Sequence, residues 1–303
     1  MKFKVLGIGE ILWDLLPSGP QMGGAPANFA CHARALGADA FLITRVGKDD
    51  FGRAIRRAVE KLGIVNGALQ VDETAPTGTV TVTLSGQGIP HFTIHENVAW
   101  DRLEATPAAL QSVRGADAIC FGTLAQRREP ARSAIQLLLS AVPSDSWRIF
   151  DVNLRQSYFS REIIECSLRL ANLLKLNESE LEVVAKMFGL SGQPRRQMET
   201  LARDFQLRLV ALTRGSAGSL LFQDGVWSDC PSVPIEIVDT VGAGDAFTAA
   251  LVQGLLHKMD LNQINSLANE VARYVCSRAG ATPPLPARFS EAFAARQVIQ
   301  NQQ

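Results

Sequence analysis

The chain turns from a strand into a helix at Asp239-Thr240-Val241-Gly242-Ala243-Gly244-Asp245-Ala246-Phe247. A strand-like pattern precedes this turn, formed by Ile235, Ile237 and Val238. Apolar residues then recur at the spacing of an α-helix, at Phe247, Leu251, Gly254 and Leu255. The segment is therefore predicted to be a loop that enters a helix.

This loop has the composition of an anion-binding site. Gly242, Ala243 and Gly244 carry almost no side chain, so three successive backbone N–H groups can face a ligand where the helix leaves its first donors unpaired. A carboxylate at Asp245 would repel an anion unless it had a task there, and the obvious task is to accept a proton from an attacking hydroxyl. The residues alone leave a second interpretation open, in which Asp245 satisfies the helix N-terminus and the glycines form a tight turn.

Length and composition favour one large α/β domain, or one domain with a small appendage. The 303 residues are 47% hydrophobic, which is enough to bury a sizeable core. Thirty basic residues balance thirty acidic ones without a block of like charge, so nothing favours a nucleic acid or an anionic membrane as a partner. The first residues enter a strand pattern without an export signal, and the five cysteines are scattered. These features predict a cytoplasmic protein with reduced cysteines.

The first strand pattern, residues 2–9, ends in Gly7-Ile8-Gly9. A dinucleotide fingerprint would need a third glycine where Leu12 stands, and the lysine motif of a P-loop is missing from the whole chain. The bulky Leu12 argues against a nicotinamide-dependent oxidoreductase. Further on, the double glycine of Gly23-Gly24-Ala25-Pro26-Ala27-Asn28-Phe29-Ala30 opens an amphipathic helix that is predicted to run to about Leu36.

Residues 79–84 alternate strictly between apolar and threonine side chains. In residues 91–95, Phe92 and Ile94 alternate with His91, Thr93 and His95. Gly86-Gln87-Gly88 lies between the two runs, so they are predicted to form a hairpin with one apolar face. A hairpin is not part of a parallel core, and we expect a small flap that covers a site or meets another subunit. His91 and His95 share one face, but without a third ligand nearby they are better interpreted as solvated strand residues than as a zinc site.

Strand and helix patterns alternate through the rest of the chain. Strand patterns cover 41–46, 118–121, 148–152, 173–176 and 209–212, and helix patterns cover 49–62, 130–141, 161–170 and 178–188. From residue 116 onward this alternation predicts a parallel sheet with helices on both faces, which binds ligands at the carboxyl ends of its strands. Polar residues gather at those ends, at Asp151, Asn153, Arg155, Asn177, Glu180, Thr213 and Gly215. Three such groups along one edge favour a binding site over ordinary turn chemistry.

Together, residues 23–30 and 239–247 resemble the two signatures of the ribokinase-like (PfkB) family of sugar kinases. The resemblance extends over essentially the whole chain and implies a single domain, residues 1–303. The implied fold is α/β, a doubly wound and mostly parallel sheet in three layers (α/β/α) with a small β-strand lid formed by segments near 11–20 and 77–97. Members of this family transfer the γ-phosphoryl group of ATP to a hydroxyl of a sugar or nucleoside.

The resemblance also implies roles for single residues. Asp245 resembles the family's catalytic base. The backbone amides of Gly242, Ala243 and Gly244 resemble the anion hole that stabilises the transferred phosphoryl group. The positions that resemble sugar-binding residues are Asp14, Gly24 and Asn28, and we expect Asn153 and Arg155 to join them. A carboxylate and an amide suit a polyol because each contacts neighbouring hydroxyls in fixed directions.

Asn177 and Glu180 resemble the family's Asn-x-x-Glu element, which holds the magnesium ion that accompanies the nucleotide. Magnesium keeps several of its waters, so both side chains are expected to act through water. The expected nucleotide contacts are Asn177, Thr213, Gly215, Gly242, Gly244 and Asn269. A site for a monovalent cation, K⁺, is expected beside the anion hole, at Asp239, Val241, Val275, Arg278 and Gly280.

The Ala25-Pro26 pair bears on the substrate. Family members that act on ribose or on phosphorylated sugars commonly have Lys-Gly here, and the missing lysine suits a neutral hexose. With Gly9-Glu10 and Asp14 ahead of it, the pair most resembles fructokinases, so fructose is the predicted substrate.

Other substrates and another function stay open. An arginine often found near residue 95 of fructokinase-like enzymes is missing, and Arg155 can equally meet a sugar acid, so 2-keto-3-deoxygluconate, ribose and a nucleoside are alternatives. A non-catalytic sugar sensor on the same fold is a further alternative, although a sensor need not keep Asp245. A homodimer through the β lid is expected.

Overall fold

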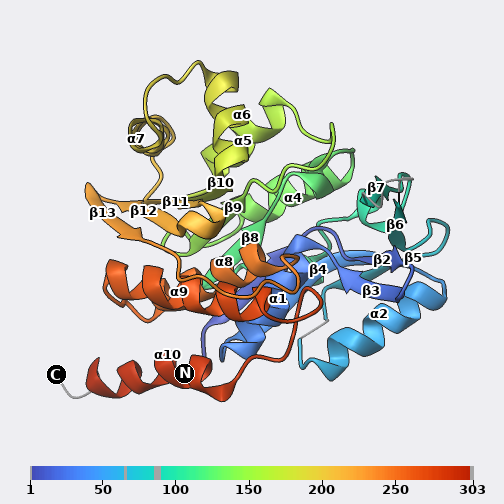
Figure 1. The fold of residues 1–303 in the computed structure, drawn as a ribbon. Helices are drawn as coiled ribbons and strands as arrows, with labels where there is room; N and C mark the ends of the chain where they lie inside the picture. Colours follow the sequence, from blue (N-terminus) through green and yellow to red (C-terminus); the bar gives the residue numbers. More distant parts are fainter. Residues whose placement is uncertain (1, 65–66, 85–89, 301–303) are drawn as a thin grey trace.

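The computed structural model describes residues 2–64, 67–84 and 90–300. Within these ranges, nine strands form one large sheet in the order β13-β12-β11-β10-β9-β8-β1-β4-β5 (Figure 1). They are β1 (Lys4–Ile8), β4 (Asp39–Gly47), β5 (Leu69–Asp72), β8 (Ala118–Phe121), β9 (Trp147–Asp151), β10 (Leu173–Asn177), β11 (Leu209–Thr213), β12 (Ser219–Gln223) and β13 (Val226–Cys230). Neighbouring strands from β5 across to β11 pair in parallel, and β12 and β13 add an antiparallel edge.

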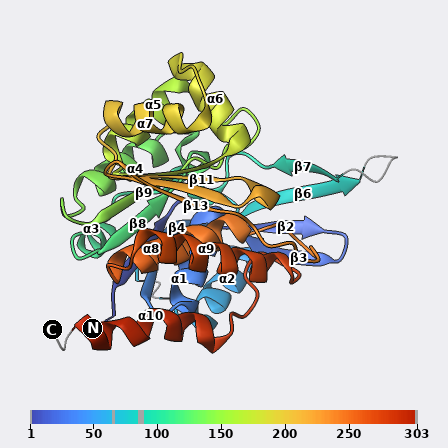
Figure 2. The same cartoon turned by 60° about the vertical axis from the view of Figure 1, so that its left-hand side comes forward.

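Helices cover both faces of this sheet, which gives the fold three layers (Figure 2). One face carries α1 (Ala25–Ala35), α8 (Ala243–Leu256), α9 (Leu261–Cys276) and α10 (Ala287–Gln300). The other carries α3 (Pro107–Val113), α4 (Ala131–Ser140), α5 (Arg161–Leu170), α6 (Glu178–Phe188) and α7 (Pro194–Asp204). Because both faces are covered, the central strands are almost continuously apolar. The predicted doubly wound, mostly parallel fold is confirmed.

Each layer of helices has its own core. Phe29 of α1 and Phe247 of α8 are buried in the core between the first layer and the sheet. Ile135 of α4 and Leu168 of α5 are buried in the core on the opposite face. Helix α2 (Asp50–Lys61) packs through Ile55 into a third cluster with α1 and β4. Burial of these faces follows from the spacing of apolar residues along each helix.

A second sheet, which we call the small sheet, projects from one side of the body with four strands described, in the order β3-β2-β6-β7 (Figure 2). Its strands are β2 (Leu12–Leu16), β3 (Gly19–Gly23), β6 (Gly78–Leu84) and β7 (Pro90–Ile94). Val80 and Val82 of β6 are buried, whereas Thr79 and Thr81 are partly exposed, as the alternation predicts. Val80 and Ile94 pack into the main core, while Phe92 is 48% exposed. The expected turn at 86–88 lies outside the described residues.

One predicted strand is wrong. Residues 235–238 form irregular chain between β13 and α8, with Ile237 and Val238 61% and 60% exposed. The backbone N–H groups of Val238 and Asp239 both donate to the carbonyl of Cys276 at the end of α9, at 2.9 and 3.2 Å. A strand needs a neighbour to satisfy its backbone groups, and no strand of the described sheets pairs with this segment.

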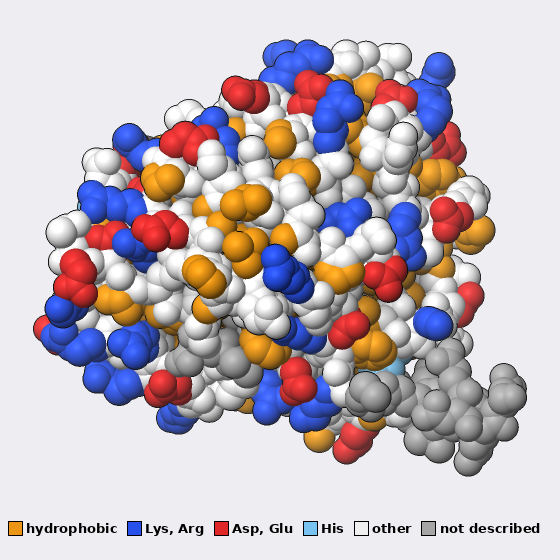
Figure 3. All heavy atoms as spheres, turned by 180° about the vertical axis from the view of Figure 1, so that it is seen from behind, with side chains coloured by type: hydrophobic (Ala, Val, Ile, Leu, Met, Phe, Trp, Pro, Cys, Tyr) orange, Lys and Arg blue, Asp and Glu red, His pale blue; other side chains and the backbone are white. Residues whose placement is uncertain are grey.

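The surface mixes charges of both signs. Basic and acidic side chains are interspersed over the rear face of the molecule (Figure 3), as expected from the balanced composition. Among the helices of the described ranges, none has the length and apolar character needed to cross a membrane.

Candidate active site

The predicted anion hole forms the first turn of α8. Gly242 is the N-cap residue and has a left-handed backbone with φ of 78°, and a Cβ there would lie 2.1 Å from the carbonyl oxygen of Ala281. Only glycine fits this position. The amide of Ala243 donates to the carbonyl of Thr240 at 3.3 Å, so this member of the expected anion hole is engaged in a turn. Gly242 and Gly244 are the better-placed donors of the three.

Asp245 is the third residue of α8 and is half-buried. Its Oδ2 accepts a hydrogen bond from Nδ2 of Asn28, a buried residue of α1, at 2.9 Å. Burial, with the negative charge of Asp151 in addition, raises the pKa of Asp245 to about 7. Because Gly242 holds the N-cap position and Asp245 is bonded to α1, the geometry favours a functional carboxylate over a helix cap. A carboxyl group that titrates near neutrality is suited to proton transfer.

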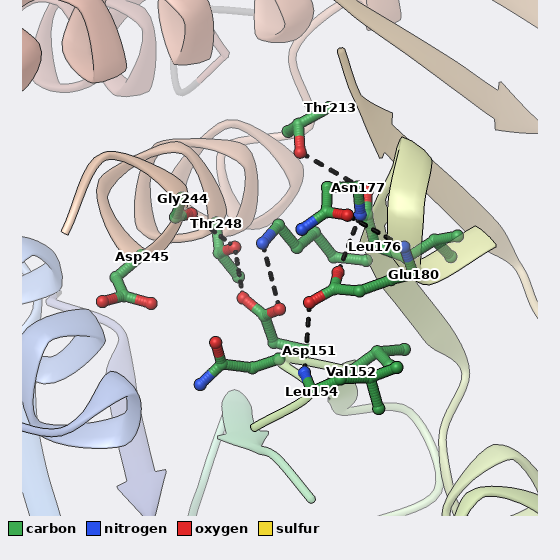
Figure 4. Close-up of polar contacts among 12 residues, drawn as sticks. Asp151, Val152, Leu154, Leu176, Asn177, Glu180, Thr213, Gly244, Asp245 and Thr248 are labelled. Carbon is green, nitrogen blue, oxygen red and sulfur yellow. Dashed lines mark hydrogen bonds and ion pairs between the residues drawn. The ribbon is translucent and has the colours of Figure 1, made fainter. Parts of the chain in front are cut away.

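A buried ion pair supports the turn from below (Figure 4). Nζ of Lys175 lies 3.0 Å from Oδ1 of Asp151, and the hydroxyl of Thr248 donates to Oδ2 of Asp151 at 3.1 Å. A Cβ on Gly244 would lie 3.1 Å from Nζ of Lys175, so the missing side chain lets the ammonium approach the helix. Burial opposes the charge of Lys175, but Asp151, Glu180 and Asp245 offset this and raise its pKa.

The sequence predictions did not include Lys175 or Thr248. A signal for Lys175 was available, since it interrupts the apolar run Leu173-Leu174-Lys175-Leu176 of a central strand. Lysine is rarely buried without a partner, so this position alone indicated a buried acid nearby.

Acidic groups surround one arginine on the side of α1. Glu10, just after β1, is buried, and Asp14 of β2 is half-buried. Burial raises the pKa of Glu10 to about 7 and also raises the pKa of Asp14. The positive charge of Arg155 acts in the opposite direction and lowers the pKa of Glu10, Asp14 and Asp245. The guanidinium is therefore within electrostatic range of three carboxyl groups. Glu10 was quoted in the fructokinase resemblance but not predicted as a site residue.

The remaining predicted sugar-binding residues border this group. Gly24 is the N-cap of α1, directly before the helix that carries Asn28. Asn153 follows β9 and has a positive φ of 41°, and its carbonyl accepts a hydrogen bond from the hydroxyl of Thr123 at 3.3 Å. Asn28 has one buried side-chain atom, Oδ1, without a protein partner. A buried acceptor of this kind is free to bind a hydroxyl.

The predicted magnesium element is a capping box at the start of α6 (Figure 4). Oδ1 of Asn177 accepts from the amide of Glu180 at 2.9 Å, and Oε2 of Glu180 accepts from the amide of Asn177 at 2.8 Å. Oε1 of Glu180 accepts from the amide of Leu154 at 3.2 Å. These are hard oxygen donors of the kind that magnesium prefers, and the two carboxylate oxygens of Glu180 each retain a lone pair that can bind an ion's water. Oδ1 of Asn177 also accepts from the hydroxyl of Ser179 at 2.7 Å, which an ion's water would have to displace. The residues fit a magnesium ion held through water.

The predicted nucleotide contacts fall into two places. Thr213 ends β11 beside β10, where its hydroxyl donates to the carbonyl of Leu176 at 3.4 Å, and Gly215 begins the short helix Gly215–Ala217. Asn269 lies instead in a buried network on α9, where its Nδ2 donates to the hydroxyl of Ser219 at 2.6 Å. The structure therefore does not present the Asn269 amide nitrogen as a free donor.

Asp239 joins the two loops of the predicted cation site. Its Oδ1 accepts from the amide of Val241 at 3.0 Å and its Oδ2 accepts from the amide of Gly280 at 3.0 Å. The amide of Arg278 donates to the carbonyl of Val275 at 3.0 Å at the end of α9. The described residues contain no group of three His, Cys, Asp or Glu side chains that could hold a metal ion. The side chain of His91 lies outside the described part.

Known proteins resemble the chain over most of its length. A model of the pfkB family carbohydrate kinases matches residues 20–288. The fructokinase of Klebsiella pneumoniae is 32% identical over 284 residues, which cover 90% of this chain and 91% of that protein.

Two solved structures extend the comparison. An uncharacterized sugar kinase from Pyrococcus horikoshii in complex with ATP matches with a TM-score of 0.79 and 29% identity, over 92% of this chain and 94% of that one. The fructokinase of Xylella fastidiosa with bound ATP has the same fold, with a TM-score of 0.85 and 18% identity, over 98% and 100% of the two chains. The resemblance carried by the two glycine-rich motifs is thereby confirmed, and the chain belongs to the PfkB family of carbohydrate kinases.

Proposed function

We propose that this carbohydrate kinase uses ATP to phosphorylate a hydroxyl of a neutral sugar, with fructose as the preferred substrate. The observation that carries the proposal is the carboxylate of Asp245, which is half-buried at the glycine mouth of α8, held by Asn28 and titrates near pH 7. It is an acceptor for a hydroxyl proton beside backbone donors for a phosphoryl group. The Klebsiella relative, a fructokinase, supports the choice of sugar.

The charges on the sugar side favour a neutral substrate. The positive charge of Arg155 interacts with three carboxyl groups, those of Glu10, Asp14 and Asp245. A further carboxylate or phosphate on the substrate would add negative charge to a region that already has a surplus of acidic groups. This argues for fructose over 2-keto-3-deoxygluconate and over phosphorylated sugars. Asp14, Gly24, Asn28, Asn153 and Arg155 are the proposed sugar contacts.

In the proposed reaction, the sugar hydroxyl gives its proton to Asp245 while its oxygen attacks the γ-phosphorus of ATP. A new O–P bond forms, the bond to the β–γ bridging oxygen breaks, and ADP leaves. The amides of Gly242 and Gly244 stabilise the negative charge of the transferred group, because they lie at the N-terminus of α8 and add no bulk. Ala243 contributes mainly by forming the turn.

Magnesium would be held through water by Asn177 and Glu180, where it supplies positive charge to the ATP phosphates. Thr213 and Gly215 border the nucleotide, and Asn269 acts on it through the network with Ser219. We place K⁺ in the loops joined by Asp239, against backbone carbonyl groups near Val241, Val275, Arg278 and Gly280. This ion would offset negative charge next to the anion hole.

We further propose that the small sheet is a lid on a single domain, residues 1–303, and that it closes over the sugar. Its exposed Phe92 suits a homodimer contact through the same sheet. A kinase that consumes ATP needs the nucleotide pool of the cytoplasm, where we place it.

The test is ADP release with ATP and magnesium over a panel of fructose, ribose, adenosine and 2-keto-3-deoxygluconate. Fructose is expected to give the highest kcat/KM. A higher kcat/KM for another substrate of the panel would overturn the choice of fructose without affecting the proposed kinase activity. Sugar binding without ADP release from any substrate would favour the sensor and refute catalysis. Repeating the assay with potassium exchanged for sodium or lithium tests the cation site.

A further inference from the structure

The loop that follows β9 carries Arg155 between two sets of contacts. It runs from the end of β9 to Ser160, whose side chain caps α5. Asn153 and Gln156 within it have positive φ values of 41° and 49°, a conformation that non-glycine residues adopt at a cost. Such backbone persists only when surrounding contacts hold it. The aim of Arg155 therefore depends on those contacts.

The first contacts hold the loop to the predicted nucleotide side. The amide of Val152 donates to the carbonyl of Lys175 at 3.0 Å, and the amide of Leu154 donates to Oε1 of Glu180 at 3.2 Å (Figure 4). The loop thus shares Glu180 with the capping box of α6. Arg155 follows this anchor directly.

The second contacts hold the loop to the small sheet. Nε2 of Gln156 donates to the carbonyl of Phe92 in β7 at 2.8 Å. The hydroxyl of Tyr158 donates to Oε1 of Glu96 at 2.9 Å and lies 3.4 Å from the carbonyl of Ile94. These contacts join positions 62 to 64 residues apart. These hydrogen bonds therefore fasten the loop to β7 and to the residues that follow it.

The end of β7 is fixed from its other side by a buried arginine. Arg127 is 2% exposed, pairs with Asp101 through Nε and Nη2 at 2.7 and 2.9 Å, and donates to the carbonyl of His95 at 2.7 Å. Its guanidinium lies 4.0 Å from the ring centroid of Trp100 and 4.7 Å from that of Tyr158. Tyr158 thus packs on a rigid base while its hydroxyl reaches the small sheet.

Arg155 itself has little to hold it. Its side chain is exposed, and Nη1 donates to the carbonyl of Leu154 at 3.1 Å. Its carbonyl accepts the amide of Tyr158 at 3.0 Å, so the residue sits in a turn closed by the tyrosine. Its guanidinium lies within electrostatic range of Glu10, Asp14 and Asp245, and its position depends on the backbone of this turn.

We infer that Gln156 and Tyr158 are positioning residues that couple the small sheet to Arg155 and thereby set the affinity for the sugar. The inference rests on the proposed function, because it takes Arg155 as a sugar contact. When the small sheet lies against the loop, Arg155 is aimed at the sugar side. When Gln156 and Tyr158 lose their hydrogen-bond partners, the strained turn relaxes and the Arg155 side chain is no longer oriented toward the proposed sugar site.

The test uses Tyr158→Phe, which keeps the ring on Arg127 and removes the hydroxyl. With the best sugar of the panel, KM for the sugar is expected to rise about tenfold, the loss typical of one hydrogen bond to a charged group. KM for ATP should stay within about twofold. Tyr274→Phe is the matched control, because the second tyrosine donates to the carbonyl of Pro284 at 3.2 Å on the exposed surface. The control should behave as the unmodified enzyme.

A double-mutant cycle separates positioning from a general loss of structure. Arg155→Ala should raise the sugar KM, and adding Tyr158→Phe to it should cause little further increase, because both act through one side chain. Independent, multiplicative effects would overturn the inference, as would an unchanged sugar KM in Tyr158→Phe. Glu96→Ala removes the acceptor of the same hydrogen bond and replaces Tyr158→Phe if that variant fails to fold.

Amide hydrogen exchange gives a readout that needs no activity. Exchange across residues 153–158 should be faster in Tyr158→Phe and Gln156→Ala than in Tyr274→Phe. Unchanged exchange would overturn the inference even in an active kinase. If the unmodified enzyme phosphorylates no sugar, the proposed function fails, whereas the exchange data still decide whether the two residues hold the turn.

Discussion

Nδ2 of Asn28 donates a hydrogen bond to Oδ2 of Asp245 at 2.9 Å, across 217 positions of the sequence. The bond connects the first turns of α1 and α8, the two helices that begin in the glycine motifs. It ties the proposed base to the proposed sugar-binding helix. The proposed sugar site and the proposed base therefore share one contact.

Replacing Asn28 by alanine should damage both steps. Asp245 loses this donor, and the buried position loses a polar group that can contact the sugar. We expect kcat to fall and the sugar KM to rise, each by about tenfold. Steady-state kinetics with the best sugar measures both. Asn262→Ala, at an exposed position of α9, is the control and should leave both constants unchanged. A change confined to KM would contradict the orienting role.

Asp245→Asn tests the base directly. The variant keeps the size of the side chain and an oxygen that can accept from Asn28, but it cannot take a proton at neutral pH. Turnover should fall by about 10² to 10⁴, while sugar affinity measured by calorimetry changes little. Turnover within tenfold of the unmodified enzyme would refute the assigned role.

The rate should depend on pH near neutrality. Burial raises the pKa of Asp245 to about 7, and the base must be deprotonated to accept the hydroxyl proton. We expect kcat/KM to rise as the pH increases through about 7 and then to level off. The measurement is a pH profile from 5.5 to 8.5 at saturating magnesium, with stability checked at each pH. A flat profile over this range would count against Asp245 as the base.

The same carboxyl should destabilise the fold at high pH. Its folded-state pKa lies above the unfolded value of 3.8, so the protonated form contributes stability that is present at low pH and lost as the pH rises through about 7. Asp245→Asn should therefore raise Tm relative to the unmodified protein at pH 8, and much less at pH 5. Thermal unfolding at the two pH values compares them. An equal shift at both would show that charge burial is not the cause.

Gly244→Ala tests the close approach of Lys175. The new methyl group would lie 3.1 Å from Nζ, so the ammonium must shift and lengthen its 3.0 Å pair with Asp151. We expect a loss of about 1 to 3 kcal/mol in the free energy of unfolding and a lower kcat. Gly115→Ala is the control, because its methyl group would meet only the side chain of Lys4 at 3.7 Å. Equal stability of the two variants would argue against a tight contact at α8.

Hydrophobic periodicity predicted six of the nine strands described in the large sheet, because a strand with both faces covered needs apolar residues throughout. The strands β5, β12 and β13 were not predicted. The run 173–176 became β10 and the run 209–212 became β11, each one residue longer at its carboxyl end. Residues 235–238 are also mostly apolar, with Ile235, Ile237 and Val238, and form no strand. Whether such a run pairs depends on a free neighbouring strand, which is a property of the assembled sheet.

The motifs predicted arrangements of site residues that are close in sequence, but not contacts between residues far apart in the chain. Asp245 lies at a helix mouth, and Asn177 and Glu180 form one local unit, because each arrangement depends on residues close in sequence. Asn269 was expected at the nucleotide, yet its amide nitrogen is engaged with Ser219, 50 positions away. Lys175 was not predicted because its partner Asp151 comes from the adjacent strand.

Short-range pattern thus sufficed for the α/β class, the family and the identity of the proposed base, since these depend on spacing between near neighbours. Packing of α1 against α8 alone brought Asn28 to Asp245 and buried that carboxylate, which raised its pKa to about 7. A hydrogen bond across 217 positions and the loss of water around a charge exist only after the layers assemble. For that reason the sequence sufficed to propose which residues react, whereas the tertiary structure decided their hydrogen-bond partners and their pKa values.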